Sequence, residues 1–459
     1  MIEPPRPIPL SPILALIRTL LQGDRDLLSL VPAEAYRIDI GSLGYSRRSI
    51  LIVNAPELTR SILTDPLDVF PKNDLMVGAL EPLVGDSMFV SSGDRWRQQR
   101  RMIDPAFSQI RIGRAFTQMT AAVDAYEAHL DGIAERNEPF SLDLAMSHLT
   151  ADIITRTVFS TSLESQVARE VFGAFTEFER SVAQVQLRRL IFDPAFKKIP
   201  QVPSVLEACS DIRAQLGQLL DTHAGVVPGK FNDIASAIVE ARDVESGAQF
   251  SREELIDQLG VMFLAGHETT ASALTWAFYI LATQPEMLRR LRAEVDEQAG
   301  TDAISFELTR QLGFVRNVFR ETLRLYPPIT FIPRVAAEST RIGRVKVKRG
   351  AMIMISPWVI HRHEKFWRAP HAFDPDRFSP QREHELISGT YIPFGQGPRV
   401  CVGAAFATTE STLILARLAR RFDFHVEAPE RVRPTARLTT RPAEQIMCRI
   451  SRRRSTRTS

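Results

Sequence analysis

Residues 394–403 read FGQGPRVCVG and carry more structural information than any other segment of this chain. The glycines and the proline indicate a tight loop, and the apolar residues 404–418 indicate a helix directly after it. Cys401 therefore stands at the N-terminus of a helix, where free N–H groups and the helix dipole favour a thiolate. A lone cysteine in this position is more often a small buried apolar residue, so the residue type alone leaves both interpretations open.

Residues 251–283 indicate the longest helix of the chain. Ser251 and Glu254 form a capping box, and Pro285 ends the helix or starts the next one. At ~1.5 Å per residue this helix is about 50 Å long, enough to cross the whole molecule. Its middle, residues 265–270, reads AGHETT and places glycine and threonine, which are poor helix formers, within an apolar helix. Such a conflict is typical of a functional site, although a close helix crossing with threonine hydroxyls bonded to the preceding turn would also explain it.

The spacing of phenylalanine, glycine, arginine and cysteine in the 394–403 loop resembles the haem-ligand loop of the cytochrome P450 family, whose iron is held by a cysteine thiolate. The resemblance implies that Cys401 is the axial ligand of the iron. It also implies that Phe394, Arg399 and Gly403 belong to the haem-binding loop. Further motifs of the family follow in the family's order, beginning at Trp96, so the similarity covers essentially the whole chain.

The AGHETT segment is similar to the oxygen-activation motif of the same family. The resemblance implies that Thr269 hydrogen-bonds dioxygen or its water and that Glu268 relays protons from solvent. We expect His267 to point away from the iron. It does not start a zinc-protease motif, because Ala271 stands where the second histidine of that motif would be.

Two further segments resemble elements that hold the haem propionates. The sequence WRQQR is similar to a family element in which an indole and a guanidinium, here Trp96 and Arg100, bind a propionate. An arginine-rich surface helix is the alternative interpretation of this segment. Arg334 has the position of a family arginine that reaches a propionate. The resemblance thus implies that Arg100, Arg334 and Arg399 surround the two propionates.

The sequence ETLR resembles the Glu-two-Arg motif of the family, and its spacing puts Glu321 and Arg324 on one helix face. Arg377, in FDPDRF, would complete a buried Glu-Arg-Arg network with a structural role. On its own this spacing is weak support, since ion pairs three residues apart are common on helices.

The chain has 459 residues, and length alone suggests about three domains. The resemblance requires distant residues such as Arg100 and Cys401 to converge on one haem. We therefore expect a single cytochrome P450 domain over 1–459, with a proline-rich segment at 1–23 and a basic tail at 449–459.

The expected fold class is mainly α with a small β-rich lobe, and the resemblance implies a long central helix crossing over the haem. Strand-like runs occur early, at 36–40 and 50–53, and again late, at 345–347 and 352–355. The two late runs flank a turn signal at Arg349-Gly350, which indicates a hairpin.

Composition excludes several classes of protein. A content of 44% hydrophobic and 24% charged residues excludes disordered, collagen-like and multi-span membrane chains. A net charge of +3 gives no whole-molecule attraction to nucleic acid. The N-terminus shows neither a transmembrane anchor nor a signal peptide. Three scattered cysteines favour a reducing compartment, and Cys209 and Cys448 are expected to be bystanders. We therefore expect a cytoplasmic monomer.

The resemblance implies a monooxygenase that binds haem b and inserts one oxygen atom from O2 into a hydrophobic substrate, such as a lipid, a terpenoid or another natural product. Only 58 residues follow Cys401, too few for a flavin domain, so electrons are expected from a ferredoxin or flavodoxin with its reductase. Arginines of the 95–114 region could form the docking surface, or an ordinary solvated face. A haem-thiolate sensor or carrier and a peroxide-driven peroxygenase are the alternatives. The presence of both Glu268 and Thr269 favours oxygenase chemistry.

Overall fold

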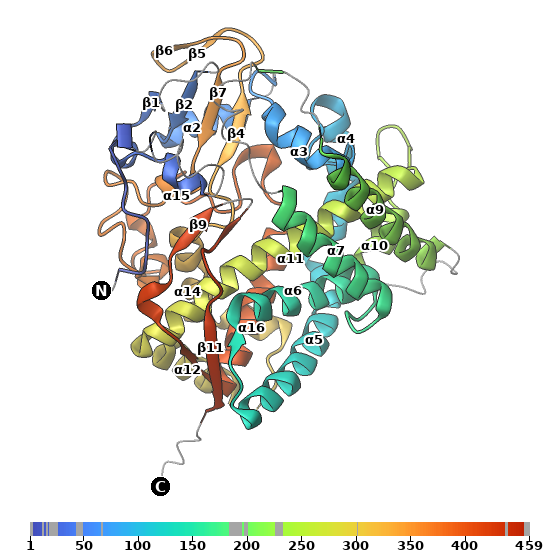
Figure 1. Ribbon diagram of the computed structural model, residues 1–459, viewed down its shortest axis with the longest axis vertical. Helices are drawn as coiled ribbons and strands as arrows, with labels where there is room; N and C mark the ends of the chain where they lie inside the picture. Colours follow the sequence, from blue (N-terminus) through green and yellow to red (C-terminus); the bar gives the residue numbers. More distant parts are fainter. Residues whose placement is uncertain are drawn as a thin grey trace.

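A small β-rich lobe and a larger helical part make up the protein, as a computed structural model shows (Figure 1). The lobe lies at the upper left of Figure 1, and the helices fill the right and the lower part. The residues that the structure describes are 3–11, 13–14, 17, 26–42, 49–65, 68–182, 195–196, 201–224, 233–300, 302–436 and 439–453.

The main sheet of the lobe joins segments from the two ends of the chain. Its order is β1 (Ile40–Ser42), β2 (Ile50–Val53), β7 (Met352–Ile355) and β4 (Ile332–Val335). Strand β7 runs parallel to β2 and antiparallel to β4. All four residues of β7 are buried, as expected for a central strand that reads as a continuous apolar run. The expectation of a lobe assembled from distant segments is confirmed.

The hairpin expected between the two late strands is wrong. Strand β6 (Val345–Val347) pairs with β5 (Thr340–Ile342) across a turn at Gly343, and β7 leaves this pair to enter the main sheet. The fully apolar sequence of β7 explains the difference, because a two-stranded hairpin would leave one of its faces in water.

The strand expected at residues 36–40 is wrong for most of its length. Residues 33–36 form a 3-10 helix, and β1 begins only at Ile40. The side-chain amide of Asn54 donates to the carbonyl oxygens of Ala35 and Ile38, at 2.8 and 3.0 Å. These bonds hold the segment as a turn in front of the strand.

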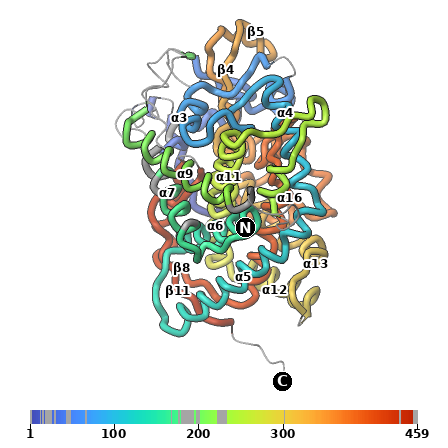
Figure 2. Tube along the Cα trace, turned by 90° about the vertical axis from the view of Figure 1, so that its right-hand side faces the viewer, coloured from blue at the N-terminus to red at the C-terminus, as the bar shows by residue number. Residues whose placement is uncertain are grey.

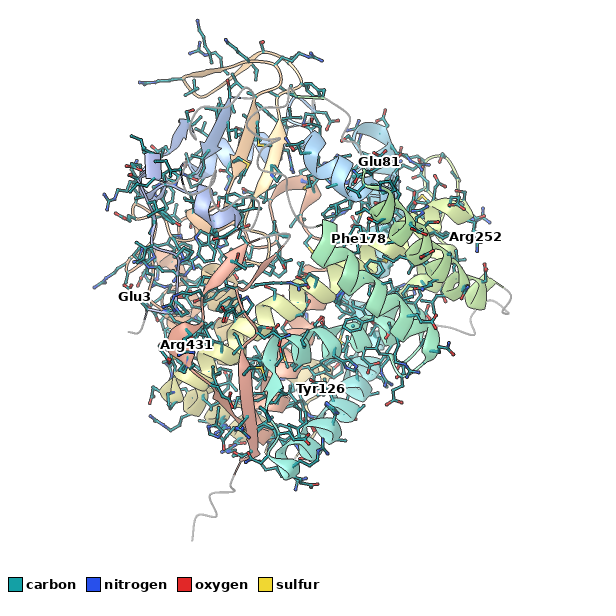
Figure 3. All side chains as sticks on the ribbon, in the orientation of Figure 1. Glu3, Glu81, Tyr126, Phe178, Arg252 and Arg431 are labelled. Carbon is teal, nitrogen blue, oxygen red and sulfur yellow. The ribbon has the colours of Figure 1, made fainter. Side chains whose placement is uncertain are left out.

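The long helix α11 (Arg252–Thr283) lies at the centre of the helical part, and the expected helix is confirmed with its capping box. It begins at Arg252, near the right edge of Figure 3, and crosses the molecule towards the lower left. It packs against α6 (Leu142–Phe159) and α16 (Ala404–Arg421). In the turned view of Figure 2, α11 again lies in the middle, with α16 beside it. Most of the core is one apolar cluster around these helices.

The remaining elements follow in chain order. The other helices are α2 (Pro56–Leu63), α3 (Asp74–Val84), α4 (Gly93–Ile103), α5 (Gln109–Arg136), α7 (Gln166–Val182), α9 (Pro203–Ala224), α10 (Ile234–Val239), α12 (Pro285–Ala299), α13 (Phe306–Gln311), α14 (Gly313–Leu325) and α15 (Pro357–Ile360). The short 3-10 helices are η1 (Leu27–Leu30), η2 (Ala33–Tyr36), η3 (Asp104–Phe107), η4 (Pro375–Phe378), η5 (Glu383–Glu385), η6 (Gly397–Arg399) and η7 (Pro429–Arg431). The other strands are β3 (Phe140–Ser141), β8 (Phe422–Val426), β9 (Pro434–Ala436), β10 (Thr440–Pro442) and β11 (Met447–Arg452).

The basic tail was expected to start at residue 449, but the first residues of this segment belong to a strand. Residues 447–452 form β11, which pairs with β8 and β3, and Arg449 and Arg452 form ion pairs with Glu427 and Asp131. Residues 454–459, and part of the expected segment 1–23, lie outside the described residues. In the described part of the chain, no helix is both long and apolar enough to cross a membrane.

Glu410 is a buried acid in α16 whose two carboxyl oxygens have no hydrogen-bond partner among the residues that the structure describes. Burial raises its pKa well above the ordinary value of 4.5, so the folded state keeps the proton that the unfolded chain releases. Stability is therefore lost as pH rises above the unfolded pKa, by up to about 1.4 kcal/mol per pH unit.

Replacement of Glu410 by glutamine is expected to remove this loss, because the amide stays neutral. In urea unfolding at pH 5 and pH 8, the free energy of unfolding of the variant should increase relative to that of the wild type as pH rises. Parallel stability curves for Glu410→Gln and wild type would contradict this assignment.

Candidate functional site

Cys401 lies at the end of a loop that folds back on itself in front of α16. Its N–H donates to the carbonyl oxygen of Phe394 at 2.9 Å. Gly397 has a φ of +77°, and a Cβ atom there would lie 2.6 Å from the carbonyl oxygen of Leu63. Only glycine fits this approach of the loop to α2. The loop therefore presents Cys401 at the N-terminus of a helix, as the sequence predicts.

The Cys401 residue is exposed, yet protein atoms crowd its sulfur, and this desolvation raises the pKa of the thiol. The N–H of Gly403 and the positive charge of Arg100 act in the opposite direction. These two contributions favour a thiolate, as the sequence predicts. Desolvation is the larger effect, so the net pKa of the thiol is raised in the chain without a ligand. A bound metal ion would supply the missing stabilisation, because a coordinating thiol is deprotonated.

Helix α4 brings two of the expected residues against this loop. The guanidinium carbon of Arg399 lies 4.3 Å from the ring centre of Trp96, and Arg399 donates to the carbonyl oxygen of Ser91 at 3.0 Å. Arg100 donates to the carbonyl oxygen of Val400 at 2.7 Å. The structure thus brings Trp96, Arg100 and Arg399 together at the cysteine loop.

Three cations gather beside this loop. Lys72 forms a single β-bridge with Arg334, and both side chains experience the charge of Arg399. Burial lowers the pKa of all three, and mutual repulsion lowers those of Lys72 and Arg334 further, while Asp68 acts the other way on Arg399. Across the described ranges, none of the three forms an ion pair with a carboxylate. Arg334 is buried, and Lys72 and Arg399 are half-buried. Cations in such surroundings that have no carboxylate partner in these ranges favour binding of an anion.

One face of α11 has accessible surface in its middle. Over residues 255–281 every residue is buried except Ala265, Gly266 and Thr269, which lie on one side of the helix. The hydroxyl of Thr269 donates to the carbonyl oxygen of Ala265 at 2.7 Å. A Cβ atom on Gly266 would lie 2.5 Å from Cδ1 of Ile154 in α6, so a close helix crossing is also present. The segment therefore contains both the accessible face expected of a functional site and the close helix crossing that is the alternative interpretation.

Glu268 faces strand β10. Its carboxylate accepts hydrogen bonds from Thr439 and, through both oxygens, from Arg441. Only 3% of the Glu268 residue is exposed. His267 lies in apolar surroundings, with its ring centre 5.1 Å from that of Phe263 and Nδ1 2.9 Å from the Phe263 carbonyl oxygen, and burial lowers its pKa.

The expected Glu-Arg-Arg residues meet in the core. Glu321 and Arg324 form a two-pronged ion pair with both distances at 2.7 Å, and both side chains are fully buried. Arg377 adds a contact of 3.2 Å to the same carboxylate. These contacts tie α14 to the segment around η4.

Comparison with protein-family models matches residues 5–449 to the description Cytochrome P450. The chain belongs to the cytochrome P450 family. Curated relatives cover nearly the same length. Cyclooctatin synthase of Streptomyces melanosporofaciens is 32% identical over 416 residues, which cover 89% of this chain and 88% of that protein. Pentalenene oxygenase of Streptomyces avermitilis is 29% identical over 401 residues, which cover 87% of each chain.

Solved structures of cytochrome P450 proteins share the fold. The haem domain of cytochrome P450DA superposes with a TM-score of 0.79 at 24% identity, covering 96% of this chain and 92% of that one. At this identity the likeness concerns the fold alone. The fold class expected from the sequence is confirmed. The protein is a haem-thiolate oxidoreductase that belongs to the cytochrome P450 family.

The residues of this cytochrome P450 fit a haem group. Haem carries propionate carboxylates, and Lys72, Arg334 and Arg399 have no carboxylate partner among the described residues. Cys401 offers a single thiol at a helix N-terminus. In the described part of the chain, no group of three histidine, cysteine, aspartate or glutamate side chains could hold a metal ion by itself. A porphyrin that brings four ligands of its own suits this donor set.

Three residues of the site escape sequence reasoning. Lys72 joins the cations only through its bridge with Arg334, and Thr439 and Arg441 reach Glu268 from a strand more than 170 residues away. No local pattern marks these positions, because each depends on long-range pairing.

Replacement of Lys72 by methionine is expected to weaken retention of haem in this cytochrome P450. A hydrogen bond to a charged group contributes ~1.5–3 kcal/mol, so transfer of haem to a scavenger apoprotein should be ~10–100-fold faster. Lys365→Met is the matched control, because Lys365 is exposed and pairs with Asp39. Equal transfer rates for Lys72→Met and the control would contradict a role of Lys72 towards propionate.

Proposed function

We propose that this cytochrome P450 binds haem b through Cys401 and inserts one oxygen atom from O2 into a terpenoid or similarly hydrophobic substrate. The observation that carries the proposal is the accessible face of Ala265, Gly266 and Thr269 within an otherwise buried α11. A helix that exposes only small residues and one hydroxyl leaves room for dioxygen and an apolar molecule. We further propose that the chain acts as a single domain and a monomer.

The substrate class rests on relatives and on apolar residues. Two relatives are named pentalenene oxygenase and cyclooctat-9-en-7-ol 5-monooxygenase, and both names belong to terpenoid chemistry. Leu264, Phe331 and Ile332 are apolar candidates for the wall of the substrate pocket, and Ile332 is half-buried in β4. Phe263 is fully buried against Phe175, which favours core packing for this residue.

When bound, haem supplies the electron transfer and the activation of dioxygen. The chain supplies the proton path and the walls of the site. Thr269 can present its hydroxyl to a dioxygen molecule once this hydroxyl turns from the carbonyl oxygen of Ala265. Glu268 can carry a proton towards this hydroxyl from the β10 side. Along residues 255–281 of α11, water is excluded on the remaining faces, because the other residues of this stretch are buried.

We propose a ferredoxin or flavodoxin with its reductase as the electron source. The expected docking surface consists of Arg95, Arg97, Arg101, Arg111 and Arg114, and three of these five arginines are paired within the chain. Arg95 pairs with Glu254, Arg97 with Asp94, and Arg101 with Asp243. A partner that docks here would have to compete with these contacts.

Oxygen-isotope labelling tests the proposed function. Candidate substrates are first selected from a terpenoid and lipid library by the spin-state shift that a bound substrate causes in the haem spectrum. Turnover with a ferredoxin, its reductase and 18O2 should then give a product that carries one labelled atom. A product labelled only from water, or turnover only with peroxide, would contradict the proposal. The second result would favour a peroxygenase.

A further inference from the structure

One stripe of α11 is bonded along its length to strand β10. Glu268, Ser272 and Trp276 follow at intervals of four residues and therefore lie on one helix face. The Ser272 hydroxyl and the Trp276 indole N–H both donate to the carbonyl oxygen of Thr440, at 2.6 and 3.1 Å. Arg441 and Thr439 bind Glu268 at the other end of the stripe. Residues 439–441 thus contact two turns of the helix.

Strand β10 is itself fixed to the core. The N–H of Thr440 donates to the carbonyl oxygen of Pro328 at 2.9 Å, and its hydroxyl donates to that of Pro327 at 2.5 Å. β10 also pairs with β9. Because the backbone is held on two sides, the position of the Arg441 side chain is set by the strand and not by a mobile loop.

Glu268 has no direct access to solvent. It is buried to all but 3%, whereas 40% of the Arg441 side chain is exposed. The two oxygens of Glu268 are bound by Thr439 and Arg441, and no hydrogen bond joins Glu268 to Thr269 in the described part of the chain. Among the described residues that bind this carboxylate, Arg441 is the one whose side chain reaches the surface, so we place the contact with water at its guanidinium.

We propose that Arg441 is the positioning residue for proton uptake by Glu268, holding the carboxylate at the solvent end of the path to Thr269. This inference rests on the proposed function, in which Glu268 serves as proton relay. The step moves a proton and no electrons. Hydronium from bulk solvent gives a proton to the carboxylate at the guanidinium and leaves water. The carboxyl then turns and gives its proton to the Thr269 oxygen, the hydroxyl releases its own proton towards dioxygen, and Glu268 returns to the carboxylate.

Removal of Arg441 should disturb this step through the geometry of Glu268. An unpaired carboxylate in a buried position is unfavourable, so it either takes up a proton permanently or turns away. In both cases it leaves the solvent end of the path. Proton delivery then slows, and a larger share of the electrons leaves as hydrogen peroxide.

The test compares Arg441→Met, Arg441→Lys, Glu268→Gln and the double variant Arg441→Met/Glu268→Gln as holoenzymes. We expect Arg441→Met to raise the peroxide formed per electron pair at least threefold and to enlarge the solvent deuterium isotope effect on product formation. Arg441→Lys should restore part of the loss, since the charge remains without the two-pronged contact. The double variant should be no worse than Glu268→Gln alone.

Ser272→Ala is the matched control, because it removes a bond between the same helix and the same strand without touching Glu268. Its peroxide fraction should equal that of the wild type. An equal rise in Ser272→Ala and Arg441→Met would overturn the proposal, since it would indicate a merely structural role of β10.

Urea unfolding of the same set gives a readout that is independent of turnover. Arg441→Met should lower the unfolding midpoint less in the Glu268→Gln background than in the wild type, and equal shifts would overturn the ion pair in solution. A wild type that forms no oxygenated product overturns the proposed function. Product formation with equal peroxide fractions in wild type and Arg441→Met overturns only the role of Arg441.

Discussion

Replacement of Cys401 by serine is expected to abolish monooxygenase activity while leaving the fold intact. The loop closes through the backbone N–H of Cys401 and through Gly397, and neither needs the sulfur. Serine cannot donate electron density to iron as a thiolate does. Because changes in groups that merely support a metal ligand already reduce activity ~10–100-fold, loss of the ligand should reduce product formation by more than about 100-fold.

Cys209→Ala is the control for this prediction. Cys209 is buried in α9, outside the 394–403 loop, and burial raises the pKa of its thiol to about 11. This variant should keep the haem spectrum and the activity of the wild type. Retention of activity in Cys401→Ser would mean that another residue binds the iron.

Replacement of Arg324 by alanine is expected to be the most destabilising change in the chain. The guanidinium binds both oxygens of Glu321 and donates to the carbonyl oxygens of His361, Pro370 and Ala372, each at 2.7–2.8 Å. Its loss breaks a buried ion-pair network and leaves Arg377, at 3.2 Å, as the cation next to the Glu321 carboxylate. Removal of one partner from a buried pair costs ~3–5 kcal/mol. This is a large part of a typical stability of ~5–15 kcal/mol.

The measurement is the free energy of unfolding in urea, together with the yield of folded holoenzyme. Arg316→Ala on the same helix is the matched control, because Arg316 is exposed and, among the described residues, donates only to the carbonyl oxygen of Arg310. The control should change stability by less than ~0.5 kcal/mol. A loss below about 1 kcal/mol in Arg324→Ala would contradict the structural role of the network.

Features encoded by neighbouring residues could be predicted from the sequence. The helix of residues 251–283 was located within one residue, because Ser251 and Glu254 form the capping box that the structure contains. The loop before Cys401 was likewise predictable, since its glycines adopt positive φ angles that other residues avoid. The proximity of Trp96, Arg100 and Arg399 followed from the resemblance to a family and not from local patterns.

Features that depend on pairing across the chain could not be predicted. The late run 352–355 was assigned to a hairpin because its partner in β2 lies 300 residues earlier. The same limit applies to Lys72 and Arg441, which act through contacts with Arg334 and Glu268. The direction of the pKa shift of Cys401 was also missed, because desolvation depends on how tightly the whole fold surrounds the sulfur.

The proposed monooxygenase function depends most on a haem iron bound by the Cys401 thiolate. The difference spectrum of the reduced protein with carbon monoxide tests this point directly. We expect the shift to long wavelength that is typical of thiolate-bound haem in the wild type and in Cys209→Ala, and its loss in Cys401→Ser. A wild-type spectrum without this shift, or one that Cys401→Ser leaves unchanged, would contradict ligation of the haem iron by Cys401.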